Sequence, residues 1–183
     1  QDAASQAVVE ALPLADGMRV LDYCAGGGGK ALAMAARARI KLFAHDADPR
    51  RMRDLPARAK RAGVNVTLTE QPGGKPFDLV LADAPCSGSG SWRRAPEGKW
   101  LLTPARLQDL LHLQARIMDD AARLVRPGGW MGYATCSLLN AENRGQVDAF
   151  LARTPGWSLC QDRRLTPLDG GDGFYIGLLQ RLS

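Results

Sequence analysis

The sequence has no long apolar run, no close pair of cysteines and few histidines. None of its hydrophobic segments approaches the roughly 18–20 residues that span a bilayer, and no signal peptide opens the chain. The four cysteines, Cys24, Cys86, Cys136 and Cys160, form no Cys-x-x-Cys pair, and the two histidines are far apart, which argues against a zinc site or another metal centre. We therefore expect a cytoplasmic protein with free thiols and neither a metal nor a membrane partner.

Acidic residues are fewer than basic ones. The chain has 24 Lys and Arg against 19 Asp and Glu, a formal net charge of +5, and a sequence pI near 9.3. This balance suits a polyanionic partner, because Lys and Arg release counterions when they neutralise phosphates. An arginine-rich, solvated helix face would give the same balance, so the charge alone leaves both interpretations open.

The order of apolar and amphipathic segments indicates the fold. At 183 residues the chain can bury a proper core, and no linker or repeat divides it. Strands that alternate with helices form a mostly parallel sheet covered on both faces. We predict one doubly wound, Rossmann-like α/β domain over residues 1–183, with the last apolar run as an antiparallel edge strand. The predicted strands are 18–23, 40–46, 64–70, 77–83, 130–136, 157–161 and 173–181; the predicted helices are 30–38, 49–62, 104–125 and 141–152, the last capped by Asn140, and a turn at 127–129 precedes the fifth strand.

A glycine run follows the first predicted strand, where doubly wound sheets bind their ligands. Gly26 to Gly29 would let the backbone approach a ligand closely and direct N–H groups at it, and Lys30 follows directly. Asp46 ends the second strand about 20 residues later, where an acid can bind both ribose hydroxyls of a nucleoside. A flexible turn and a surface carboxylate are the alternatives. The residues themselves leave NAD and S-adenosylmethionine both possible.

Two cysteines follow the fourth and fifth predicted strands. If these strands are neighbours, Cys86, Cys136 and Asp83 lie together beside the cofactor site. A thiolate that adds to carbon 6 of cytosine makes carbon 5 nucleophilic, and a carboxyl group at nitrogen 3 can stabilise the charge on the base. A thiol with a pKa near 8.5 is only partly ionised at neutral pH, and Lys30 could assist its ionisation. A single buried cysteine is usually structural, so this interpretation depends on the pair.

The chain resembles the RNA 5-methylcytosine methyltransferase family, the Sun/Fmu group. Two motifs, each at the end of a predicted strand, carry the resemblance: DAPCSGSG (83–90) and YATCS (133–137). It extends over nearly the whole chain. The supporting motifs are QDAAS (1–5), LDYCAGGGGK (21–30), RRAPEGKW (93–100), PGG (127–129), NAEN (140–143) and DGFY (172–175).

The resemblance implies a class I S-adenosylmethionine-dependent enzyme that methylates carbon 5 of a cytosine in RNA, with ribosomal RNA favoured over tRNA. Cys136 would attack carbon 6, Cys86 would assist release of the methylated RNA, and Asp83 would contact the base. A duplex hides carbon 6, so the cytosine must be single-stranded or flipped out. The residues that would bind the cofactor are Cys24, Ala25, Gly26, Gly27, Gly28, Gly29, Lys30, Asp46, Arg51 and Asp83.

The glycine run departs from the family pattern, which has Ala-Pro where this chain has Gly26-Gly27. Loss of the proline raises the cost of ordering the loop by up to about 1 kcal/mol, so we expect weaker cofactor binding. Three rival hypotheses are a mechanism with Cys86 as nucleophile, as in DNA cytosine methyltransferases, a non-catalytic RNA-binding or assembly module, and a nicotinamide-dependent oxidoreductase. The missing G-x-G-x-x-G motif and the paired cysteines argue against the last.

The segment after Cys86 is basic and aromatic, so it is a candidate for contact with RNA. For its tryptophans, packing within the protein is an equally good interpretation. The candidates for phosphate contacts are Arg93, Arg94 and Lys99, and those for base stacking are Trp92 and Trp100.

Overall fold

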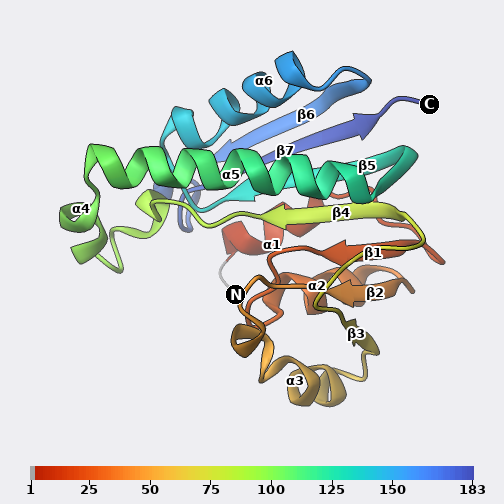
Figure 1. The fold of residues 1–183 in the computed structure, drawn as a ribbon. Helices are drawn as coiled ribbons and strands as arrows, with labels where there is room; N and C mark the ends of the chain where they lie inside the picture. Colours follow the sequence, from red (N-terminus) through yellow and green to blue (C-terminus); the bar gives the residue numbers. More distant parts are fainter. Residues whose placement is uncertain (1–2) are drawn as a thin grey trace.

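The computed structural model describes residues 3–183, and these form a mixed sheet with helices on both faces (Figure 1). Its seven strands lie in the order β3-β2-β1-β4-β5-β7-β6. Strands β1 to β5 are parallel, whereas β7 runs antiparallel to its neighbours β5 and β6. The expected antiparallel strand is therefore present; it lies one position inside the edge, and β6 is the edge strand. The strands are β1 (Arg19–Asp22), β2 (Lys41–Ala44), β3 (Val66–Leu68), β4 (Phe77–Asp83), β5 (Val125–Thr135), β6 (Trp157–Leu165) and β7 (Phe174–Arg181).

Helices connect the parallel strands and cover the sheet. The longest begins where Thr103 caps it: the Thr103 side chain accepts a hydrogen bond from Arg106 N, and Pro104 occupies the first turn, where its missing N–H costs nothing. Figure 1 shows this helix lying along β4 and β5. The helices are α1 (Ala3–Glu10), α2 (Gly29–Arg37), α3 (Leu55–Ala62), α4 (Glu97–Leu101), α5 (Pro104–Leu124) and α6 (Arg144–Arg153).

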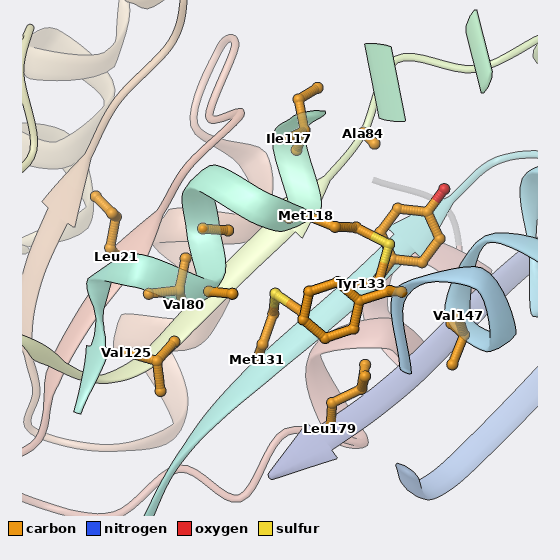
Figure 2. Close-up of a cluster of buried hydrophobic side chains, with 14 of the residues drawn as sticks. Leu21, Val80, Ala84, Ile117, Met118, Val125, Met131, Tyr133, Val147 and Leu179 are labelled. Carbon is orange, nitrogen blue, oxygen red and sulfur yellow. The ribbon is translucent and has the colours of Figure 1, made fainter. Parts of the chain in front are cut away.

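The core has one layer on each face of the sheet, because alternate residues of the central strands point to opposite faces. On one face, α5 and α6 pack on Val80, Met131 and Tyr133, with Met118 of α5 against Tyr133 (Figure 2). On the other, α1 and α2 pack on a second set of buried residues that includes Leu79 of β4. The central strands are thus apolar on both faces, as the continuous hydrophobic run of β4 indicates.

Strands β4 and β5 are neighbours, as the two-cysteine hypothesis requires. They pair in parallel, with Asp83 opposite Ala134 near their carboxyl ends. The segments that follow them, which carry Cys86 and Cys136, therefore leave the sheet at the same edge. This arrangement confirms the expectation on which the predicted site depends.

Three predicted boundaries are wrong. The helix predicted over 49–62 is a 3-10 turn at Pro49–Met52 followed by α3, because Pro56 lacks an N–H and restricts the residue before it, so one α-helix cannot continue through it. The helix predicted to be capped by Asn140 begins at Arg144, after a 3-10 turn at Asn140–Glu142.

The third boundary concerns the turn predicted at 127–129, which lies within β5. The ladder with β4 shifts register there, from Phe77 opposite Val125 to Leu79 opposite Trp130, so the glycine pair forms an irregularity inside the strand. The predicted strand 157–161 also extends to Leu165. Helices α1 and α4 were not predicted; Gln1 and Asp2 of the QDAAS motif lie outside the described residues.

Candidate active site

The two cysteines of the predicted site meet at the carboxyl edge of the sheet. The Sγ atoms of Cys86 and Cys136 are 3.3 Å apart, and both thiols are free and partly buried. Their hydrogen bond lowers the pKa of Cys136. The same bond, together with burial, raises the pKa of Cys86. Cys136 is therefore the more acidic thiol of the pair, the one that ionises first, and Cys86 is the one that retains its proton.

Lys30 directly follows the glycine turn, and its side chain forms an ion pair with Asp83, which precedes the Cys86 segment. Its Nζ lies 2.6 Å from Oδ2 of Asp83, and its side chain is only 11% exposed. The positive charge of Lys30 lowers the pKa of Cys136, whereas the negative charge of Asp83 opposes it. The structure thus places together all four predicted catalytic residues: Lys30, Asp83, Cys86 and Cys136.

The glycine turn has a defined backbone that larger residues would not tolerate. Gly26 and Gly28 have positive φ angles of 49° and 76°. A Cβ on Gly28 would lie 2.1 Å from Leu55 Cδ1, so the first turn of α3 closes over the loop. Space and backbone conformation both require glycine at position 28, which argues against the interpretation as a flexible turn.

Asp46, at the end of the second strand, is buried and braces this turn. Its Oδ2 accepts a hydrogen bond from Gly26 N (2.9 Å) and lies 3.4 Å from Arg51 Nη1, and its Oδ1 accepts from Asp48 N (3.0 Å). A carboxylate has about four acceptor positions. Asp46 therefore holds the turn and the segment after β2 together and retains capacity for a ligand hydroxyl.

A cavity of about 270 Å³ lies beside the turn. It contains three of the predicted cofactor residues, Cys24, Asp46 and Arg51, whereas the Lys30–Asp83 pair and the two cysteines form a neighbouring group outside its lining. Burial raises the pKa of Cys24, so this residue contributes a neutral thiol to the wall. The lining residues are Tyr23, Cys24, His45, Asp46, Ala47, Arg51, Pro85, Leu113, Arg116, Ile117 and Asp120.

A larger, open depression of about 490 Å³ lies at the other end of the strands. Residues from the last turns of α5 and α6, the start of β6 and the end of β7 line it, and none of the predicted site residues does. Its volume alone therefore gives it no link to the site at the carboxyl edge.

Sequence reasoning missed Asp22, the last residue of β1. It is 1% exposed, and among residues 3–183 neither of its carboxylate oxygens has a hydrogen-bond partner. Burial raises the pKa of Asp22 to about 7, and the negative charge of Asp83 adds to the effect. A buried acceptor without a partner is costly, and this one lies beside the cofactor turn. The only signal in the sequence was its place in the LDYCAGGGGK motif.

Sequence reasoning also missed Glu142, which is fully buried beside the cysteine pair. Its carboxylate accepts hydrogen bonds from Ser87, which follows Cys86, and from Ser137, which follows Cys136. The NAEN motif contained this residue, but its spacing from the cysteines did not indicate any contact with them.

The segment after Cys86 is ordered by contacts at its two ends. Gly90 N donates to the carbonyl of Cys136 (3.0 Å), and Arg94 pairs with the buried carboxylate of Asp172. Beyond them, α4 projects past the carboxyl edge of the sheet (Figure 1), and Trp100 on it is 80% exposed. Trp92 is half-buried, near Gly98 of α4, so only Trp100 presents an open aromatic face.

Residues 3–183 contain no group of three or more His, Cys, Asp or Glu side chains arranged to hold a metal ion. In the same part of the chain, no helix combines the length and hydrophobicity that crossing a bilayer requires. The site at the carboxyl edge therefore consists of thiols, carboxylates, one ammonium group and backbone.

Comparison with known sequences gives a consistent set of relatives. The model of the family described as 16S rRNA methyltransferase RsmB/F matches residues 9–180. Ribosomal RNA small subunit methyltransferase B of Salmonella arizonae is 36% identical over 98% of this chain, which covers 46% of the relative. The protein of the same name from Xanthomonas campestris pv. campestris is 42% identical. The match covers 97% of this chain and 42% of the length of that relative. The chain thus spans less than half the length of these relatives.

Solved structures give the same fold. The crystal structure of PH0851 superposes with a TM-score of 0.93 at 31% identity, over 99% of this chain and 46% of that one. The structure of NSun6 from Pyrococcus horikoshii with SFG gives a TM-score of 0.89 at 25% identity, over the whole of this chain and 53% of that one.

Proposed function

Because the chain belongs to the 16S rRNA methyltransferase RsmB/F family, we propose that it transfers a methyl group from S-adenosylmethionine to carbon 5 of a cytosine in RNA. Its sheet has the class I methyltransferase arrangement, with the candidate site at the carboxyl ends of β1, β4 and β5. The names of the relatives support ribosomal RNA as substrate. That substrate would place the activity in the cytoplasm.

One observation carries the proposed chemistry: two thiols share a hydrogen bond at the end of adjacent strands, and their pKa values are shifted in opposite directions. The Cys136 sulfur, with its lowered pKa, is the better nucleophile at neutral pH. The Cys86 thiol, with its raised pKa, keeps its proton. This asymmetry supports Cys136 as the attacking group and argues against the rival mechanism that begins with Cys86.

The proposed reaction begins with addition of the Cys136 thiolate to carbon 6 of the cytosine. A bond forms between sulfur and carbon 6, and the electron pair moves into the ring, so carbon 5 becomes nucleophilic. Asp83 would contact the base, and Lys30, 2.6 Å from it, balances its charge. The pair would stabilise charge as it develops on the base.

Release of the product requires a base that removes the proton from carbon 5. Once Cys136 is bonded to carbon, its sulfur is uncharged and can no longer raise the pKa of Cys86. Cys86 would then release its own proton to water and, as a thiolate, accept the proton from carbon 5, and the Cys136 thiolate leaves carbon 6 as the ring double bond re-forms. The 3.3 Å separation would thus make attack and release sequential uses of one thiol pair.

The residues beside the glycine turn fit S-adenosylmethionine. This molecule, when bound, supplies an electrophilic methyl group. The carboxylate of Asp22 is buried and has no hydrogen-bond partner in the described part of the chain. It and the carboxylate of Asp83 suit the ammonium group at the amino-acid end of this molecule. Asp46 and the apolar wall formed by Pro85 and Ile117 suit a nucleoside in the 270 Å³ cavity. Between these two places, Gly27 is the exposed residue of the turn, whereas Gly26 and Gly28 are buried.

A cysteine-variant experiment tests the proposal. We would incubate Cys86→Ala and Cys136→Ala variants with S-adenosylmethionine and cytosine-containing RNA and resolve protein–RNA adducts on a denaturing gel. Cys86→Ala should accumulate an adduct, because attack proceeds and release fails, whereas Cys136→Ala should give none. Cys160→Ala is the matched control, since Cys160 is exposed on β6 and away from the pair. The reverse pattern would assign the attack to Cys86. If no variant and no parent protein gives adduct or product, the non-catalytic RNA-binding alternative is favoured.

A further inference from the structure

We infer that Glu142 is a positioning residue: its buried carboxylate holds the Cys86 and Cys136 segments at the distance from which the two thiols act together. The geometry itself stands without any assumption about the reaction, while the consequence for turnover rests on the proposed function.

Each oxygen of the Glu142 carboxylate accepts two hydrogen bonds. Oε1 accepts from Ser87 N (2.8 Å) and from Gln114 Nε2 (3.0 Å). Oε2 accepts from Ser87 Oγ (2.5 Å) and from Ser137 Oγ (2.5 Å). Ser87 and Ser137 are the residues directly after the two cysteines. One side chain therefore fixes both segments at the position next to the reactive sulfur.

Further contacts make this connection rigid. Gln114 of α5, besides its bond to Glu142, donates to the carbonyl of Pro85, which directly precedes Cys86 (2.9 Å). Ser89 Oγ lies 3.0 Å from Ser137 Oγ and accepts from Leu138 N at 2.8 Å. The two segments are thus hydrogen-bonded to each other just after the cysteines, and Ser87, Ser137 and Gln114 all donate to Glu142.

A carboxylate is the group that suits this position. With four acceptor sites and no donor, it requires both serine hydroxyls to donate toward it, which fixes their orientation. A buried carboxylate is costly unless it is hydrogen-bonded, and all four acceptor positions of Glu142 are filled. A glutamine has nearly the same shape, but its amide nitrogen would face two hydroxyls that now point hydrogens at it. At least one of the serine contacts must then rearrange, and the segment that carries it can move.

The rate at which the two thiols form a disulfide measures their relative position directly, without RNA or cofactor. Diamide oxidises the pair: the S–S bond forms, both thiol protons are lost, and the azo group is reduced to a hydrazine. We expect Glu142→Gln to slow this reaction by about tenfold or more, since small displacements of reacting atoms have effects of this size. Loss of the Glu142 charge by itself would ease ionisation of Cys86 and speed the reaction. Slower oxidation therefore reports position rather than charge.

Two further variants make the experiment decisive. Ser87→Ala keeps the carboxylate and removes one of its hydroxyl donors, so it should slow oxidation less than Glu142→Gln does, in a protein expected to fold normally. Gln146→Leu is the matched control, because Gln146 is also buried and bonds the carbonyl of Leu111, joining α6 to α5 without touching either cysteine segment. It should oxidise at the parent rate. Parent-like oxidation of Glu142→Gln, or equal slowing in Gln146→Leu, would overturn the inference.

Turnover gives a second readout. Glu142→Gln should lower kcat by about tenfold to a hundredfold and leave KM for RNA and for S-adenosylmethionine near parent values, because the residue touches neither. A KM increase with unchanged kcat would contradict a positioning role. If the parent protein itself shows no methyl transfer, the proposed function fails, whereas the disulfide measurement still decides the role of Glu142.

Discussion

The Sγ atoms of Cys86 and Cys136 lie 3.3 Å apart and share one hydrogen bond, so the two thiols are chemically unequal before any substrate arrives. The same bond lowers the pKa of Cys136 and raises that of Cys86. In the proposed mechanism the first step and the last step would therefore fall to different sulfurs. It also makes the assignment measurable in the isolated protein.

Cys136 should react with iodoacetamide faster than Cys86 at pH 7, because the hydrogen bond from Cys86 lowers the pKa of Cys136. In the Cys86→Ala variant the donor to the Cys136 thiolate is lost, so the pKa of Cys136 rises and its alkylation at pH 7 slows. Mass spectrometry of the modified peptides, as a function of pH, would measure both effects. Preferential labelling of Cys86 in the parent protein would contradict the assignment.

Lys30→Met should raise the pKa of Cys136, because it removes the positive charge that favours the thiolate. We expect alkylation of Cys136 at pH 7 to slow by about threefold to tenfold and to recover at high pH, where the thiol ionises regardless. Lys41, the exposed first residue of β2, gives the control variant Lys41→Met. It should leave the midpoint of the pH dependence of Cys136 alkylation unchanged. If the alkylation midpoint of Cys136 is the same in Lys30→Met as in the parent, the Lys30 charge does not act on Cys136.

Asp22 should make the protein less stable as the pH rises. Burial raises its pKa in the folded state to about 7, whereas in the unfolded chain it is about 3.9. Between these values the unfolded state has already lost the proton and the folded state retains it. The free energy of unfolding should therefore fall by up to about 4 kcal/mol from pH 4 to pH 7 and change little above that. Urea unfolding at pH 5 and pH 8 should show about 2–3 kcal/mol of this loss in the parent and a much smaller one in Asp22→Asn, and equal losses would refute the prediction.

Gly28→Ala should destabilise the glycine turn more than the same change at Gly63. Both glycines have positive φ, 76° and 66°, so each substitution costs about 1 kcal/mol in backbone strain. Only at Gly28 does the new Cβ meet another side chain, Leu55, at 2.1 Å; nothing lies within 4 Å at Gly63. We expect about 1–3 kcal/mol of further destabilisation at Gly28 and weaker binding of S-adenosylmethionine. Calorimetry of both variants would test this, and equal effects would show that the loop relaxes without cost.

Trp100→Ala should weaken binding of single-stranded RNA. Trp100 is 80% exposed on α4, with Lys99 Nζ 5.6 Å from its ring, and stacking of one base on an aromatic side chain contributes about 1–3 kcal/mol. Fluorescence anisotropy with a labelled RNA would measure the loss, and Trp100→Phe should restore part of it. The matched control is Leu182→Ala, an exposed apolar residue near the other end of the strands. Unchanged affinity in Trp100→Ala would exclude α4 as a stacking surface.

Prediction from the sequence failed mainly where local and distant contacts compete. Helix α4 has only five residues, and charged and apolar residues are mixed along it without a repeat. Hydrophobic periodicity therefore gave no sign of it. Asn140 looked like a helix cap, but the residue at the N-cap is Asn143, whose side chain makes no capping bond. It accepts from Thr135 Oγ1 (2.5 Å) and donates to the carbonyl of Ser137 (2.9 Å). These contacts cross between β5 and the segment after it, so the fold and not the local sequence decides where α6 begins.

The sequence by itself determined the alternation of strands and helices, the glycine turn and the two cysteines at strand ends, because each depends on short-range pattern: hydrophobic period, backbone freedom of glycine and residue type. Tertiary structure alone decided what those residues do to one another. The pairing of β4 with β5 brings Cys86 and Cys136 to 3.3 Å, and the packing of the NAEN turn buries Glu142 between their segments. The opposite pKa shifts of the two thiols and the raised pKa of Asp22 arise from burial and from neighbours distant in sequence. Such effects depend on distance and dielectric environment, which no local pattern of residues encodes.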